Sequence, residues 1–183
     1  SVIMIPFFSL RQGEVIRIES SDRVMLIDVG VTGSPGSGFA GQEFAPRGIT
    51  SVNSTTFLHD CRILTGGTIV AGGFGNAGLR VEGGLAVLRD CSIAGGGGGS
   101  ADALGNVGPG TGGPGVRVMA AGAVWSINTR LTGGRGGSGS IFGGPSGQPG
   151  PRFEAPPGAL TELAAVTTTL TTTAVVLVDP IMG

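Results

Sequence analysis

The chain contains no lysine and no tyrosine, and only 13% of its 183 residues are charged. Its 11 basic residues are all arginines, 12 residues are acidic, and the formal net charge is -1. Binding to nucleic acid or to an anionic membrane surface needs concentrated positive charge, which this composition does not supply. No apolar run reaches the roughly 18–20 residues that a membrane-spanning helix needs. The sequence therefore predicts neither nucleic-acid binding nor a membrane span.

The beginning of the chain also lacks two features. The segment SVIMIPFFSL has no initiating methionine and no basic region before its apolar residues. We interpret it as a mature N-terminus left after removal of a signal peptide, with a trimmed chain as the alternative. This interpretation predicts a secreted or cell-surface protein. The two cysteines do not fix the redox compartment by their number alone.

Glycine is the residue that the chain has in excess. Its 38 glycines are about three times the usual share of roughly 7%. Such a content is typical either of disorder or of a fold dominated by backbone contacts. Hydrophobic residues make up 40% of the chain, however, and a disordered chain has fewer. The chain is therefore expected to fold, and its length suits a single domain.

A repeat organises the sequence. Three segments align, namely GITSVNSTTFLHDCRILTGG, GLRVEGGLAVLRDCSIAGG and GVRVMAAGAVWSINTRLTGG, and DRVMLIDVGVTG is an earlier, more diverged copy. The alignment gives a polar column of Asp28, Asp60, Asp90 and Asn128, a column of Val29, Cys61, Cys91 and Thr129, and an apolar column of Val31, Ile63, Ile93 and Leu131. Only the glycine-rich insert after each copy changes in length, and a fixed period of this kind is typical of repeat architectures.

The residue pattern within each copy of the repeat predicts β-strands. Each consists of short alternating pieces rich in β-branched residues, without the spacing and caps of a helix. A strand repeat of this length with variable inserts at one place resembles the right-handed parallel β-helix of the pectate-lyase-like superfamily. The resemblance covers about residues 15–160 and implies an all-β solenoid of about four to five coils, with the glycine-rich loops layered on one side. Residues 1–14 are then an apolar N-terminal cap strand, and residues 161–183 a Thr- and Val-rich C-terminal strand segment.

The resemblance also implies a polysaccharide as ligand. The chain lacks, however, the paired aspartates and the Gly-His-Gly segment of polygalacturonase-type members, and its acidic column is regularly spaced and does not resemble the calcium cluster of the lyases. The sequence therefore predicts no enzymatic activity and no cofactor.

The glycine-rich inserts leave every copy at the same place, so their chains must lie on one side. Glycine allows close approach of backbones and positive φ without steric cost. Two alternatives stay open, namely flexible surface loops and packed layers of polyproline-II-like chain that form a second lobe. Apolar residues in the inserts favour the packed layers, because we expect their burial; they are Phe74, Leu104, Val107, Ile141 and Phe142.

The polar column Asp28, Asp60, Asp90 and Asn128 predicts a structural turn, because Asp and Asn side chains bond their own backbone in turns. Stacked carboxylates repel one another, but arginines lie one or two residues away and offset the charge. A Ca²⁺ site on Asp28, Asp60 and Asp90 is the first alternative, since hard cations take oxygen ligands. A catalytic role is the second.

Cys61 and Cys91 occupy one column and are expected to be inward neighbours in successive coils. A disulfide needs Cβ atoms about 3.5–4.5 Å apart, slightly closer than the spacing between strands. The spacing favours stacked free thiols, and a bridge stays open as the alternative.

Two single residues complete the candidates. His59 is the only histidine, and its neighbour Asp60 points to the opposite face of a strand, so a surface position is expected and not a catalytic pair. Trp125 shares an apolar column with Phe57 and Val87. We expect core packing for Trp125, with a sugar-binding platform as the alternative.

Both ends of the chain are apolar and prone to form strands. The candidate assembly residues are Val2, Ile3, Ile5, Phe7, Phe8, Val166, Leu170, Val175, Val176, Leu177 and Val178. Extended terminal strands suit strand exchange with another subunit, and head-to-tail contacts produce filaments when they do not close. The sequence thus predicts a structural, self-associating extracellular scaffold or fibre subunit. The alternatives are a carbohydrate-binding or carbohydrate-modifying protein and an ice- or surface-binding protein, although the threonines cluster in the tail.

Overall fold

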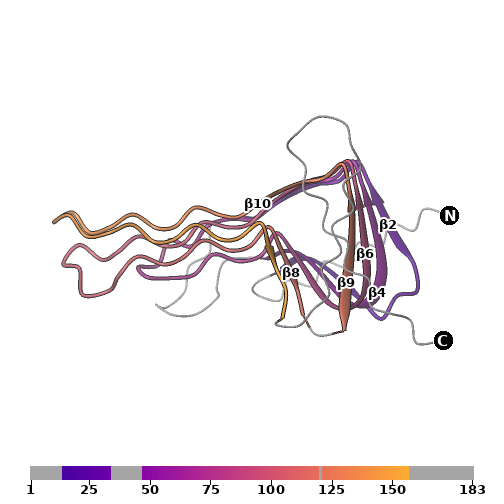
Figure 1. Ribbon diagram of the computed structural model, residues 1–183, viewed down its shortest axis with the longest axis horizontal. Coiled ribbons are helices and arrows are strands. Elements are labelled where there is room, and N and C mark those ends of the chain that lie inside the picture. The colour runs from indigo at the N-terminus through magenta and orange to yellow at the C-terminus, as the bar shows by residue number, and fades with distance from the viewer. Residues whose placement is uncertain (1–13, 34–46, 120, 157–183) are drawn as a thin grey trace.

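The structure is a computed structural model that describes residues 14–33, 47–119 and 121–156 (Figure 1). Within these residues there is no helix, and every pair of strands is parallel. The prediction of an all-β chain is confirmed. The candidate assembly residues, which lie between positions 2 and 8 and between positions 166 and 178, are outside the described residues.

Each repeat contributes strands to two sheets. The first sheet contains β1 (Glu14–Glu19), β2 (Val24–Ile27), β4 (Arg47–His59), β6 (Leu79–Arg89), β8 (Val116–Val118), β9 (Gly122–Ile127) and β11 (Phe153–Glu154). The second contains β3 (Gly30–Thr32), β5 (Arg62–Leu64), β7 (Ser92–Ala94) and β10 (Arg130–Thr132), in the spatial order β10-β7-β5-β3. In the first sheet the order is β1-β4-β6-β8-β11, with β2 beside β4 and β9 beside β6.

Successive repeats pair in register. Ile49 of β4 lies opposite Leu79 of β6, and Leu79 lies opposite Val116 of β8. In the second sheet Ile63 lies opposite Ile93, which in turn lies opposite Leu131. The columns aligned in the sequence are therefore columns in space.

Two bends per repeat turn the chain, and both use left-handed backbone conformations. One bend lies within the long strands, where Asn53 has a φ of 45° and Gly83 a φ of 77°. The other separates the two sheets and falls on the polar column, where Asp60 has a φ of 53° and Asp90 a φ of 54°. Asn, Asp and Gly tolerate this conformation better than other residues, which explains the Asp and Asn residues of the second bend. At the first bend the equivalent positions in the outer repeats are Ser20 and Ala121, which adopt positive φ as well.

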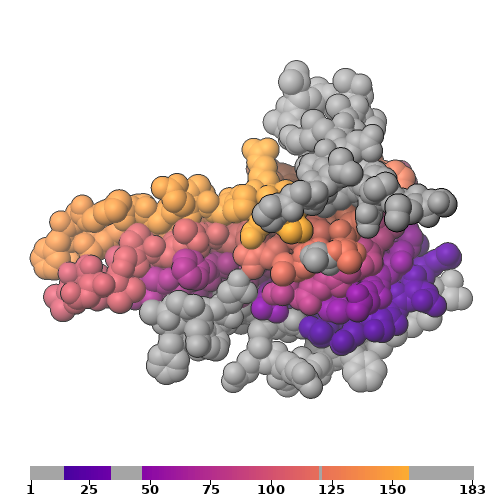
Figure 2. All heavy atoms as spheres, turned by 60° about the horizontal axis from the view of Figure 1, so that its bottom comes forward, coloured from indigo at the N-terminus to yellow at the C-terminus, as the bar shows by residue number. Residues whose placement is uncertain are grey.

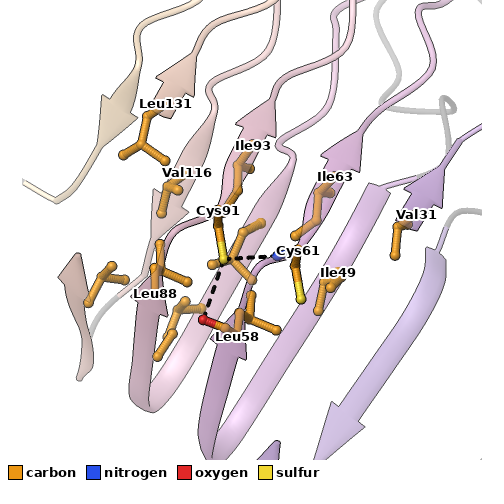
Figure 3. Close-up of a cluster of buried hydrophobic side chains, with 14 of the residues drawn as sticks. Val31, Ile49, Leu58, Cys61, Ile63, Leu88, Cys91, Ile93, Val116 and Leu131 are labelled. Atoms are coloured by element: carbon orange, nitrogen blue, oxygen red, sulfur yellow. Dashed lines mark hydrogen bonds between the residues drawn. The ribbon is translucent and has the colours of Figure 1, made fainter. Parts of the chain in front are cut away.

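The core lies between the walls of strand that these bends create (Figure 3). The apolar side chains of alternate residues point inward, and the largest fully buried ones include Ile49, Leu58, Ile63, Leu79, Leu88 and Ile93. Burying an aliphatic side chain of this size stabilises a fold by about 1.5–3 kcal/mol. The columns therefore stabilise the stack of repeats along its length.

The glycine-rich inserts form a lobe that extends from one side of the strands (Figures 1 and 2). Each insert runs outward, turns and returns. On the outgoing rows, the N–H groups of Thr65 and Thr68 donate to the carbonyls of Ala94 and Gly97 in the next insert, at 3.2 and 3.0 Å. The bonds recur at every third residue, which is the period of a polyproline-II helix. These hydrogen bonds agree with the packed layers and not with flexible loops.

Glycine is required where outgoing and returning rows of the lobe are hydrogen-bonded to each other. The N–H of Gly113 on a returning row donates to the carbonyl of Gly96 at 2.8 Å, and the carbonyl of Gly113 accepts from Gly134 at 2.8 Å. A Cβ atom at Gly113 would overlap the carbonyl of Asn76. The rows can therefore approach only because no side chain stands between them.

We predict that Gly113→Ala lowers the free energy of unfolding of the lobe by about 1–3 kcal/mol, because the new methyl group forces neighbouring rows apart. Gly108→Ala is the matched control, since a Cβ atom there meets no atom within 4 Å. Urea denaturation combined with hydrogen exchange of the lobe amides measures both variants. Equal stability of the two variants would contradict the packed lobe.

Candidate functional site

The polar column forms the corner between the two sheets. At each corner the N–H of the aspartate donates to a carbonyl of the next repeat: Asp28 to His59 at 3.0 Å, and Asp60 to Arg89 at 3.0 Å. Asp90 donates in the same way to Ile127 at 3.1 Å. The backbone of the corner is therefore part of the hydrogen-bonded ladder.

Polar side chains at this corner converge on Asp90. The side-chain amide of Asn128 donates to Oδ1 of Asp90 at 2.5 Å, and Nε of Arg89 lies 3.3 Å from Oδ2. Nδ1 of His59 lies 3.8 Å from the same Oδ2 atom. The sequence alone does not indicate that His59 lies beside the aspartate of the next repeat. The in-register columns were the signal that could have revealed it, because residue 59 aligns with residue 89.

A metal at this corner finds no support in the geometry. In the described ranges, no group of three or more His, Cys, Asp or Glu side chains is placed to hold a metal ion. Oδ1 of Asp90 is already engaged by the Asn128 amide. The arrangement is that of a hydrogen-bonded turn ladder.

The second candidate pair, Cys61 and Cys91, consists of buried free thiols (Figure 3). The backbone N–H of Cys61 donates to Sγ of Cys91 at 3.5 Å. The single S–H group of Cys61 is within hydrogen-bond distance of the carbonyls of His59, at 3.3 Å, and Leu26, at 3.4 Å. That of Cys91 can reach the carbonyls of Arg89, at 3.1 Å, and Leu58, at 3.4 Å. The thiols thus satisfy carbonyls at the inner side of the corner.

The two thiols perturb each other in opposite directions. Interaction with the neighbouring Cys91 side chain favours the thiolate of Cys61 and lowers the pKa of Cys61 to about 6, although burial acts against this shift. The same interaction, together with burial, raises the pKa of Cys91. Both side chains are nevertheless closed to solvent, at 2% and 3% relative exposure, so the pair is placed for packing and not for reaction with external substrates.

The expected burial of Trp125 is wrong. Trp125 lies opposite Val87 in the predicted column, but 47% of its surface is exposed. The reason is the alternation along the strand: Val124 and Ser126 are buried, so Trp125 points to the other side. With Met25 and Phe57 in the same column, it forms an outward apolar ladder across β2, β4, β6 and β9.

The expected burial of the apolar residues in the lobe is contradicted for four of the five; Val107 is half-buried. Leu104, Ile141 and Phe142 are between 74% and 79% exposed, and Phe74 is 43% exposed. Glycine rows pack backbone against backbone and leave no interior into which these side chains could turn. Phe74 instead lines a shallow groove of about 450 Å³ with Thr111, Pro114, Pro149 and the ion pair Arg117–Glu154.

Comparisons with protein-family models, with curated proteins and with solved structures give no match for this chain. The resemblance to the pectate-lyase-like superfamily therefore stays a prediction. Among the described residues, no helix is long and apolar enough to cross a membrane.

We predict that Asp60→Val lowers the free energy of unfolding by about 1–2 kcal/mol, because a β-branched residue is strained at positive φ. Asp60→Asn is the matched control, since Asn adopts this conformation readily and occupies the equivalent corner at position 128. Chemical denaturation with and without Ca²⁺ measures both. A stabilisation by Ca²⁺ that Asp60→Asn abolishes would overturn the structural role in favour of a metal site.

Proposed function

We propose that this protein is a structural, self-associating extracellular scaffold or fibre subunit, built as a right-handed parallel β-helix whose copies stack end to end. The in-register columns support the β-helix, because each repeat then forms one turn that is displaced from the next by the strand spacing of about 4.8 Å. Right-handed connection is the strong preference for parallel strands joined by a crossover.

One observation carries the scaffold function, namely that both sheets have open edges in the described part of the chain. There β3 pairs only with β5, and β10 pairs only with β7. In the first sheet, β1 and β2 pair only with β4 at one end, and β9 and β11 each have one partner at the other. Unpaired edges are templates for further strands.

Parallel pairing makes the two ends of the stack complementary. Each repeat presents the same pattern of donors and acceptors to the next, so the edge at β10 can continue into the edge at β3 of another copy. Such a contact joins two different surfaces and produces a filament unless the rotation closes a ring. In this proposal the apolar end segments, residues 1–14 and 161–183, control access to the edges or exchange between copies.

The full chain is therefore expected to form assemblies whose light scattering increases with concentration. Introducing two charges on the predicted apolar face of the tail, with Val176→Glu and Val178→Glu, weakens association by about tenfold or more, because the charges resist desolvation. Thr171→Glu with Thr173→Glu is the matched control, since the sequence alternation places these residues on the other face. Light scattering and negative-stain electron microscopy measure the result. Monomers at all concentrations would overturn the scaffold function.

Carbohydrate binding is the second candidate, and the exposure of Trp125 favours it. An exposed aromatic ring offers a flat apolar surface with a polar edge, on which a sugar ring can stack. On the same outward face, Arg89 and His59 lie opposite each other on β6 and β4 and supply hydrogen-bonding groups. The ice-binding alternative has no comparable support, because the described residues show no outward column of threonines.

We expect a polysaccharide ligand to change the fluorescence of Trp125, which is the only tryptophan in the chain. Titration with polygalacturonate tests this in the unmodified chain. In isothermal titration calorimetry, Trp125→Phe should weaken binding less than Trp125→Ala, which removes a stacking interaction of about 1 kcal/mol or more. Met25→Ala is the control, because Met25 lies in the same outward column three repeats away. An unchanged spectrum with uronic-acid and neutral polysaccharides would exclude this candidate.

A further inference from the structure

The last layer of the glycine lobe, residues 133–151, ends in unused hydrogen-bond donors. On the outgoing row of the previous layer, Gly95, Gly98 and Ala101 donate to the carbonyls of residues 132, 135 and 138, at 2.9, 2.8 and 2.8 Å. The equivalent residues of the last layer are Gly133, Gly136 and Gly139, because Ala94 lies opposite Thr132. Their N–H groups have no acceptor in the part of the chain that the structure describes.

The backbone direction explains why these donors face away from the lobe. A Cβ atom at Gly133, Gly136 or Gly139 would point into the returning row of the same layer, toward Gly150, Gly147 or Gly144. The next residue in each period, Gly134 or Gly137, donates inward, to Gly113 or Gly110, at 2.8 and 2.9 Å. The remaining donors are thus three residues apart on the side where a further layer would lie, the outer side of the last layer in Figure 2.

The returning row of the last layer differs. In the two preceding layers, Gly75 and Gly112 donate to the carbonyls of Thr111 and Gln148, both at 2.9 Å. The equivalent residue of the last layer is Pro149, which has no N–H group. The outgoing row therefore offers donors to an incoming chain, while proline removes one from the returning row.

The opposite end of the lobe offers acceptors. The carbonyls of Gly97 and Thr111 in the second layer accept from the first layer. Their equivalents in the first described layer are Gly67 and Phe74, whose carbonyls accept no backbone hydrogen bond from described residues. Among the described residues, one end of the lobe thus has open donors, and the other end open acceptors.

We propose that the N–H groups of Gly133, Gly136 and Gly139 dock the glycine lobe of a second copy of this chain. This inference rests on the proposed stacking of copies and assigns a separate surface to it. A second copy fits because its lobe repeats every third residue, about 9.3 Å along a polyproline-II chain, which is the spacing of the donors. A chain docked here approaches glycine and meets no side chain at the donor positions.

The lobe contact also specifies the alignment of the copies. A strand edge accepts a slip of two residues without changing which side chains face inward. The lobe accepts only slips of three residues, because its donors recur with that period. A contact between copies that keeps both the strand pairing and the lobe hydrogen bonds therefore excludes small shifts of one copy along the other.

Hydrogen exchange of individual amides tests the proposal on the full chain. Assemblies and dilute monomers are exchanged in D₂O, dissolved in dimethyl sulfoxide and read by NMR. The amides of Gly133, Gly136 and Gly139 should exchange at least about 100-fold more slowly in the assembly, as expected for newly hydrogen-bonded groups. Gly134 and Gly137 are internal controls and should be protected in both states, because they already donate within the lobe.

The outcomes separate the two proposals. If assemblies form and the three amides exchange as fast as in the monomer, the lobe contact is wrong and the scaffold function stands. If no assembly forms at any concentration, the scaffold function fails and the lobe contact fails with it.

A chemical variant removes one donor without adding a Cβ atom. N-methylglycine in place of Gly136, introduced by in vitro translation, should leave the circular dichroism of the monomer unchanged and weaken association by about tenfold. N-methylglycine in place of Gly108 is the control, because Gly108 is exposed and donates no backbone hydrogen bond to described residues. Equal association of the two variants would overturn the lobe contact.

Discussion

Parallel hydrogen bonding in register is the constraint on which the rest of this structure depends. Because each repeat lies one strand spacing from the next, every column contains equivalent residues of successive repeats. A column that is apolar and inward, such as Ile63 with Ile93 and Leu131, adds burial with each repeat. A column of like charges would add repulsion, and the amide of Asn128 against Asp90 relieves it at one end of the polar corner.

The same spacing explains the glycine content. The inserts leave neighbouring repeats and must therefore lie as close to one another as the strands do, while they also pack between outgoing and returning rows. At positions such as Gly113, a neighbouring carbonyl occupies the place of a Cβ atom. The described layers of the lobe consequently have no apolar interior, and their stability comes from backbone hydrogen bonds at every third residue. Leu104, Ile141 and Phe142 are exposed at its surface for this reason.

This arrangement places the candidate functions at surfaces and edges and not in a cavity. The buried thiols and the backbone N–H groups of the polar corner are engaged inside the ladder. What stays open in the described residues are the strand edges, the donor row of the last glycine layer and the outward ladder that ends at Trp125. Edges suit the continuation of the stack, whereas the aromatic ladder suits a flat ligand.

The sequence by itself determined the repeat, its strand character and its columns, because hydrogen-bonded strands in register require equivalent residues at equivalent positions. It also located the corners, since Asp and Asn recur where the backbone adopts positive φ. Only the tertiary structure decided which side of each strand faces inward near Trp125, because both alternating sets there contain apolar residues. The pairing of His59 with Asp90 and the exposure of Phe142 likewise depend on contacts between repeats and on the absence of an interior in the lobe, and neither is encoded in one repeat alone.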